Sequence, residues 1–422
     1  MKLNKVIGAG LIIACLVVGS ITSVLVVWAK DLGLIGMTTL LLGACIIVTI
    51  AAFKLIEVLD FLKISSKSLG GVARAGLGNG IGITVAFCCL LILAYQIITT
   101  ISPVLTAIVW GQTLKVVWVP QVLKICLAVI LCFAVYVVSR GAKAIDLTNR
   151  FWLALALAGL VFASWSSLSV KELSLMTMLP SMELFEINQL LDFFGNYGTL
   201  VIIPLGVFSS SCLLLPALYH YLDRDKNATK QAVLVGMVIA LVVLCWLMIV
   251  AILSGSKDQT MLVSEAATLP LGDFSSLVKF FANKFIYPVG YLGFVSITQL
   301  AVLVWGWWLT ATELVKSFSR ASYGRLVVLS SMIAVVGIGL LRIKGSPLAS
   351  LGTAGCLKAA LIALALLLPS FLIPKLGKTS PEFADKYANS NWIWWLVMLL
   401  IFGLIGGFLV SIVRYLTTVS GV

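Results

Sequence analysis

The stretch Gly19-Ser20-Ile21-Thr22-Ser23 interrupts an apolar run that extends from Val6 to Ala29. A second cluster, Ser209-Ser210-Ser211-Cys212, interrupts the apolar run from Leu200 to Tyr221. Each run is long enough to cross a bilayer as a helix. Small and polar residues within such a helix serve either close helix packing or a site that needs polar groups. The two clusters lie in the first helix of each half of the chain, and this matched placement favours a binding site.

The composition is that of an integral membrane protein. Hydrophobic residues make up 61% of the 422 residues and charged residues only 11%, with a mean hydropathy of +1.14. A soluble domain has about 25% charged residues. The net charge of +13 indicates basic loops beside anionic lipid, and no nucleic-acid partner is expected because no basic run is interleaved with aromatic residues. The nine cysteines lie in apolar segments without a CxxC pair, so neither a metal nor a cofactor is expected.

Apolar runs bounded by charged residues or by Gly and Pro predict eleven transmembrane helices. Most of the 29 Lys and Arg residues fall on one side if the N-terminus is cytoplasmic. This bias predicts a cytoplasmic N-terminus, and an odd number of spans then places the C-terminus outside a bacterial cytoplasmic (inner) membrane. The expected spans are residues 6–29, 35–58, 80–104, 119–139, 149–168, 199–221, 232–254, 286–312, 325–342, 350–374 and 391–415.

The spans divide into two sets of five. Residues 1–168 form the first five-helix repeat, 169–198 an external loop, and 199–374 the second repeat. Residues 375–422 supply a cytoplasmic loop and the eleventh helix. Because five is odd, the second repeat must run inverted to the first, and the broken first and sixth helices would meet near the membrane midplane. The expected fold class is an all-α membrane protein with a 5+5 inverted repeat and one extra C-terminal helix.

Several short stretches together resemble the bacterial hydroxy/aromatic amino acid permeases, which include tyrosine- and tryptophan-specific carriers of the amino acid–polyamine–organocation superfamily. The stretches, in chain order, are Gly8-Ala9-Gly10-Leu11-Ile12-Ile13-Ala14, Leu55-Ile56-Glu57-Val58, Leu69-Gly70-Gly71-Val72-Ala73-Arg74, Leu77-Gly78, Asp146-Leu147-Thr148-Asn149-Arg150-Phe151, Pro216, Tyr221-Leu222-Asp223 and Leu368-Pro369-Ser370-Phe371-Leu372. The resemblance implies a leucine-transporter-like fold and secondary transport of an amino acid, often coupled to protons. The expected partners are therefore an amino acid substrate, the bilayer and a coupling ion, a proton rather than sodium.

Two substrate-facing stretches depart from the pattern of this family. The family's first-span motif is Gly-Thr-Thr-Ile-Gly-Ala-Gly-Met, and of this the stretch Cys15–Thr22 keeps only the central glycine. The stretch Ser209–Cys212 replaces a Phe-Gly-Phe-His-like motif of the aromatic carriers. The sequence therefore leaves the substrate open between an aromatic and a small hydroxy amino acid.

The chemistry of an amino acid zwitterion suits a pair of broken helices. Free N–H groups at a half-helix N-terminus attract the carboxylate, and free carbonyls at a C-terminus attract the ammonium group. Alternatively, Ser and Thr bond back to their own helix and leave it continuous. The candidate substrate-binding residues, from both clusters and from polar positions in the third and eighth spans, are Gly19, Ser20, Thr22, Ser23, Tyr95, Gln96, Thr99, Ser209, Ser210, Ser211 and Gln299.

Three ionisable residues within or beside the apolar layer are candidates for ion coupling. Glu57 and Glu313 lie at the inner ends of the second and eighth spans, where an interfacial charge or a structural ion pair is the alternative. Lys358 lies deeper, where a lysine either snorkels, binds a substrate carboxylate or replaces a coupling cation.

Other functional classes fit the sequence less well. His220 is the only histidine, and no acidic metal-binding cluster is evident, so an enzyme is not expected. A channel or a structural membrane protein would not need two interrupted helices. A transporter-like protein that has lost transport stays an alternative, because both breaks differ from the family pattern.

Overall fold

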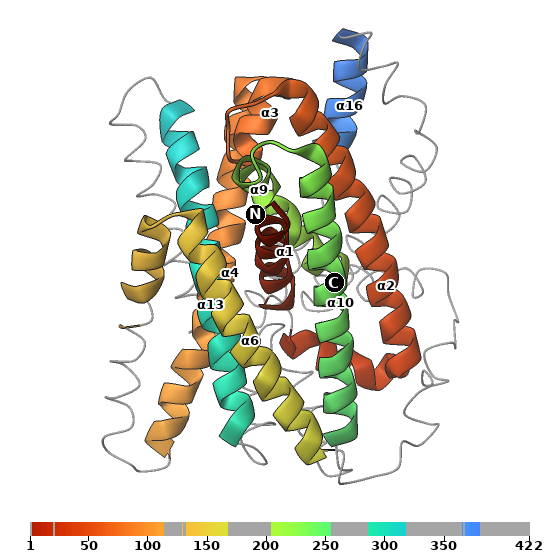
Figure 1. Ribbon diagram of the computed structural model, residues 1–422, viewed down its shortest axis with the longest axis vertical. Coiled ribbons are helices and arrows are strands. Elements are labelled where there is room, and N and C mark those ends of the chain that lie inside the picture. Colours follow the sequence, from red (N-terminus) through yellow and green to blue (C-terminus); the bar gives the residue numbers. More distant parts are fainter. Residues whose placement is uncertain are drawn as a thin grey trace, which may run out of the picture.

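The structure, a computed structural model, describes residues 2–19, 22–113, 129, 132–167, 204–254, 286–317, 365 and 368–379. Within these ranges every regular element is helical (Figure 1). The elements are α1 (Lys2–Gly19), α2 (Thr22–Leu62), α3 (Leu69–Leu77), α4 (Asn79–Thr113), α6 (Ala142–Ser167), the 3₁₀ helix η2 (Ser210–Leu214), α9 (Leu215–Tyr221), α10 (Lys226–Ser254), α13 (Ile286–Ser317) and α16 (Leu368–Thr379).

Helix α1 forms the centre of the assembly. It packs against α10, α6, α13 and η2, and Figure 1 shows it enclosed by longer helices. The consecutive residues Ile12, Ile13, Ala14 and Cys15 are all buried, and because successive residues are about 100° apart around a helix, every side of α1 is buried there. A helix that is apolar and buried on all sides is a core element. The first predicted span therefore lies inside the protein rather than against lipid.

Two glycines allow α1 and α10 to pack closely. A Cβ atom built on Gly236 would lie 2.6 Å from the carbonyl oxygen of Gly10. A Cβ atom built on Gly10 would lie 2.9 Å from Val235 Cγ1. Small residues at a helix crossing let the two backbones approach each other, as is common in membrane proteins.

The first two predicted spans divide differently in the structure. Helix α1 ends at Gly19, and α2 begins at Thr22 and continues to Leu62, through the expected loop at residues 30–34. The prediction of separate helices over 6–29 and 35–58 is wrong in this respect. The segment from Thr22 to Leu62 contains no proline, so nothing in it obliges a helix to end, whereas the Gly-Ser cluster does coincide with a boundary.

Two helices in the described part are long and apolar enough to cross a bilayer, namely Ile35–Leu62 and Lys226–Trp246. In the second of these, Leu234, Val238 and Val242 are exposed at a spacing of four residues and form one apolar face. Such a face suits contact with lipid. The predicted spans 325–342 and 391–415 and the loop 169–198 lie outside the described residues, so the count of eleven spans and the division into repeats stay predictions.

One end of the assembly collects most of the polar contacts and is called the polar end here. It lies uppermost in Figure 1, where α1, α6 and α10 begin and where α2, α9 and α13 end. Helix α3 lies across this end and packs against α4 and α16. At the opposite end of α1 the last turn is buried, with Val17 and Val18 at 0% and 3% exposure, and it contacts η2.

Candidate functional site

The serine cluster of the sixth segment departs from α-helical geometry. Residues 204–209 are α-helical, Ser210–Leu214 form the 3₁₀ helix η2, and α9 follows with Pro216 in its first turn. A 3₁₀ stretch inside a longer helix often marks a hinge or a functional site. The expected break is thus a change of helix type, and the serines in it, at positions 209 to 211, are buried.

The hydroxyl groups of Ser210 and Ser211 bond to their own helix. Ser210 Oγ donates to the carbonyl oxygen of Val207 at 2.6 Å, and Ser211 Oγ donates to that of Phe208 at 2.6 Å. This back-bonding is the alternative that the sequence left open. Ser210 Oγ also lies 3.4 Å from the carbonyl oxygen of Leu16, so the contact joins η2 to the last turn of α1.

The hydroxyl of Ser209, unlike those of Ser210 and Ser211, does not bond to its own helix. The residue is fully buried, and its Oγ makes no hydrogen bond within the described part of the protein. A buried hydroxyl without a partner costs about 1–3 kcal/mol. Ser209 is therefore the serine of this cluster whose hydroxyl is available to a ligand.

Helices α4 and α13 bring further polar candidates into the interior. Gln96 and Gln299 are both buried, at 6% and 2% exposure. A Cβ atom on Gly306 of α13 would lie 2.8 Å from Leu214 Cδ2 of η2 and 3.5 Å from Leu93 Cδ2 of α4. Gly306 of α13, the helix that carries Gln299, therefore lies close to Leu214 of η2 and to Leu93 of α4, the helix that carries Gln96.

The remaining candidates are only partly described. Gly19 is the last residue of α1. The structure places Thr22, Ser23, Tyr95 and Thr99 in helices but does not describe their side chains, and Ser20 and Lys358 lie outside the described residues.

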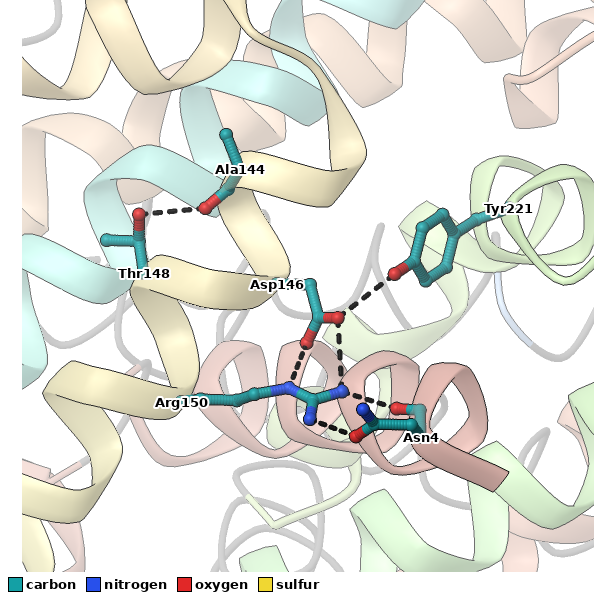
Figure 2. Close-up of polar contacts among 6 residues, drawn as sticks. All are labelled: Asn4, Ala144, Asp146, Thr148, Arg150 and Tyr221. Carbon is teal, nitrogen blue, oxygen red and sulfur yellow. Dashed lines mark hydrogen bonds and ion pairs between the residues drawn. The ribbon is translucent and has the colours of Figure 1, made fainter. Parts of the chain in front are cut away.

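A second set of polar residues, Asn4, Asp146, Arg150 and Tyr221, lies at the polar end and is called the Asp146 cluster here (Figure 2). Arg150 Nε donates to Asp146 Oδ1 at 2.7 Å, and Arg150 Nη2 to Asp146 Oδ2 at 3.1 Å. Arg150 also donates to the side-chain and backbone oxygens of Asn4. Tyr221 Oη donates to Asp146 Oδ2 at 3.0 Å. The cluster therefore ties α1 and α9 to α6.

Local sequence explains half of this cluster. Asp146 and Arg150 are four residues apart, so they lie on the same face of α6 and pair within the helix. The helix begins at Ala142, before the predicted start at 149, so both residues lie in its early turns. A Cβ atom on Gly8 would lie only 2.1 Å from Asp146 Oδ1, so a glycine is required where the carboxylate approaches α1.

Of the three ion-coupling candidates, the two glutamates form ion pairs. Glu57 contacts Lys54 Nζ at 3.1 Å and Lys230 Nζ at 2.8 Å, which links α2 to α10. Glu313 lies 3.7 Å from Arg74 Nη2, which links α13 to α3. Both carboxylates lie at the polar end, in the last turns of α2 and α13.

The end of α9 has further polar contacts with α2 and the loop that follows it. Tyr219 Oη donates to Asp60 Oδ1 at 3.1 Å. His220 Nε2 lies 3.2 Å from the carbonyl oxygen of Ser66, and Arg224 Nε donates to its Nδ1 at 3.4 Å. Since Nδ1 accepts a hydrogen bond, Nε2 carries the proton and donates to Ser66. His220 therefore fastens the helix end.

Asp146, Arg150 and Tyr221 are not among the site residues predicted from the sequence, although all three lie in stretches that carry the resemblance to the permease family. The i, i+4 spacing of an acidic and a basic residue was a usable signal for the pair. Nothing local could have shown that Asn4 and Tyr221, 146 and 75 residues away from their partners, complete the cluster.

Solved structures share this fold, among them several of one transporter. A crystal structure of a manganese transporter from Eremococcus coleocola, in complex with an aromatic bis-isothiourea substituted compound, is 11% identical and has a TM-score of 0.58. The alignment covers 98% of this chain and 86% of that one. A single-site variant of the same transporter is 12% identical, with the same coverage and TM-score. No curated protein matches the sequence. The fold is thus one that a membrane transporter adopts.

The family follows from the sequence match. Residues 2–407 match the tryptophan/tyrosine permease family, and the chain belongs to this family. The resemblance drawn from the short stretches is therefore confirmed. The protein is a multi-pass membrane protein of a transporter family.

Proposed function

We propose that the protein is a secondary active transporter that moves an amino acid across the bacterial cytoplasmic membrane by alternating access, coupled to protons. The observation that carries this proposal is the pairing of two helix discontinuities in the interior. Helix α1 ends at Gly19 beside η2, and Ser210 Oγ lies 3.4 Å from the Leu16 carbonyl oxygen. Helix ends that face each other supply the N–H and carbonyl groups that bind a zwitterion.

The proposed architecture has eleven spans with a 5+5 inverted repeat, and its polar end faces the cytoplasm. In support, basic residues from several helices gather at this end, among them Lys5, Lys54, Arg74, Arg150 and Lys230. An excess of Lys and Arg is the mark of the cytoplasmic side. The C-terminus would then lie outside.

The proposed substrate is an aromatic amino acid, as the family description suggests, with a small hydroxy amino acid as the alternative. The alternative draws its support from the buried hydroxyl of Ser209, which could bond to a polar side chain. The similar solved structures are of a manganese transporter. A manganese site would need several metal-binding side chains close together, and among the described residues of this chain no group of three His, Cys, Asp or Glu is placed to hold a metal ion.

Uptake of labelled amino acids into proteoliposomes tests this proposal directly. We expect accumulation of tryptophan or tyrosine that depends on an inward proton gradient and is lost when an ionophore collapses the gradient. A competition series distinguishes the substrates: a preference of tryptophan over serine of about tenfold corresponds to about 1.4 kcal/mol. If serine or threonine competes better, the small hydroxy substrate replaces the aromatic one. Binding without uptake would instead identify a transporter-like protein that has lost transport.

Proton coupling has Glu313 and Lys358 as its main candidate residues. Glu57 fits a structural role better, because lysines from two helices contact its carboxylate. Glu313→Gln and Lys358→Gln should each reduce uptake driven by a proton gradient, while counterflow exchange of substrate without a gradient should persist. Loss of both activities together would point to substrate binding rather than to coupling.

A further inference from the structure

The Asp146 cluster joins the two helices that end at the proposed substrate site. Helix α1 runs from the polar end to its terminus at Gly19, and α9 runs from η2 back to the polar end. Each is therefore a short rod with a discontinuity at its inner end. Helix α6, to which both are fastened at the polar end, is continuous from Ala142 to Ser167. A short helix that ends at such a discontinuity can tilt as a rigid body, with the discontinuity as its hinge.

We propose that the Asp146 cluster is a releasable latch of the polar end, holding α1 and α9 against α6 in the closed arrangement seen here. This inference rests on the proposed transport function. When Arg150 releases Asn4 and Asp146 releases Tyr221, the two rods separate from α6. A path then opens between the serine break and the polar end.

The distribution of charge makes this release feasible. The ion pair between Asp146 and Arg150 lies within α6, and the contacts that cross between helices are hydrogen bonds to neutral partners. Separation of the helices therefore leaves both charges paired. Breaking a partly buried ion pair would strand an uncompensated charge, which is strongly unfavourable. The cluster can open repeatedly because Asp146 and Arg150 stay paired with each other on α6.

Two further features lie near the cluster in the chain. Asn149, one turn beyond Asp146, is 1% exposed, and neither atom of its amide makes a hydrogen bond within the described part of the protein. In the open state that we propose, water would reach this amide, and the closed state lacks the hydrogen bonds that water would supply. Lys5 and Asp223 form a second link between α1 and the turn after α9, at 2.8 Å, but the Asp223 side chain is 73% exposed. This outer pair is screened by solvent and contributes little.

The variant Gly8→Ala, which adds one methyl group to α1, tests the latch. In Gly8→Ala the new Cβ would lie 2.1 Å from Asp146 Oδ1, so the carboxylate must move away from α1. Tyr221→Phe removes one hydrogen bond and keeps the ring. Gly43→Ala is the matched control, because its Cβ would meet nothing within 4 Å.

Two native cysteines report opening. Cys15 of α1 and Cys212 of η2 are buried, at 4% and 1% exposure, and Cys89 of α4 is buried at 2% and serves as the reference for unfolding. Purified protein is treated with a water-soluble thiol reagent, and labelling rates are read peptide by peptide by mass spectrometry. We expect Gly8→Ala to raise the labelling rate of Cys15 or Cys212 by about tenfold, or 1.4 kcal/mol. Tyr221→Phe should raise it severalfold, and Gly43→Ala should leave it unchanged.

The latch is overturned if neither Gly8→Ala nor Tyr221→Phe changes the labelling of Cys15 and Cys212. It is also overturned if Cys89 becomes labelled in parallel, because the cluster would then hold the fold together rather than close a path. If Gly8→Ala does not yield folded protein, Tyr221→Phe decides alone. Labelling does not require transport, so the two proposals can fail separately. Faster labelling of the variants, in a protein that shows no uptake, would support the latch and reject the transport function. Unchanged labelling, in a protein that does take up amino acids, would reject the latch and support the transport function.

Discussion

Replacing Asn149 by leucine should stabilise the protein and slow its opening. The side chain is 1% exposed, and neither amide atom has a hydrogen-bond partner among the described residues. An unsatisfied buried polar group costs about 1–3 kcal/mol, and removal of the amide recovers this cost. The change of shape in a packed interior costs up to about 1.5 kcal/mol. The expected net gain is therefore about 1 kcal/mol.

Thermal unfolding of the detergent-solubilised protein measures this gain. A stabilisation of about 1 kcal/mol should raise Tm by about 1–2 °C in a chain of this size. Because the gain applies to the closed state, the labelling rate of Cys15 should fall by about fivefold. Thr310→Val is the control, since Thr310 Oγ1 donates to the Gly306 carbonyl oxygen at 2.9 Å and its removal should lower stability by about 1 kcal/mol.

One result would refute this reasoning. If Asn149→Leu lowers Tm as Thr310→Val does, the amide of Asn149 has a partner in the folded protein. Its burial would then be a satisfied interaction rather than a cost of the closed state. The contribution of Asn149 to opening would have to be withdrawn, while the contacts of Arg150 and Tyr221 would be unaffected.

Three further predictions concern the site, the topology and an ion pair. Ser210→Leu should abolish amino acid uptake with a normal amount of protein in the membrane, because the larger side chain would fill the contact between η2 and α1; undiminished uptake would remove η2 from the site. Reporter fusions at Val422 should be periplasmic and fusions after Lys226 cytoplasmic, and the opposite signal at either position would rule out the eleven-span topology. Glu57→Gln should lower the free energy of unfolding by more than about 1 kcal/mol, because it leaves two partly buried lysines without their counter-charge, and should leave the dependence of uptake on the proton gradient intact. Loss of that dependence would assign the coupling to Glu57.

The sequence predicted the membrane class, the family and the places where two helices are interrupted. These features depend on composition and on residues close together in the chain. Local sequence shows an apolar run long enough for a bilayer and a Gly-Ser cluster within it. It also shows the short stretches that carry the family resemblance and their order along the chain. The same local signals could not show that residues 30–34 continue as helix in α2, because charged residues such as Lys30 and Asp31 are compatible with either a loop or a helix end.

Tertiary structure decided which polar groups meet. It buried Ser209 without a partner, gave Glu57 lysine partners from two helices, and brought Asn4 and Tyr221 to the Asp146–Arg150 pair. The sequence placed an acid and a base on one face of α6, but the neighbours of that face depend on how α1 and α9 pack against it. Gly8 allows this packing, because a side chain there would displace the carboxylate. Contacts across 75 to 146 residues follow from the shapes of the packed helices, which no local pattern specifies.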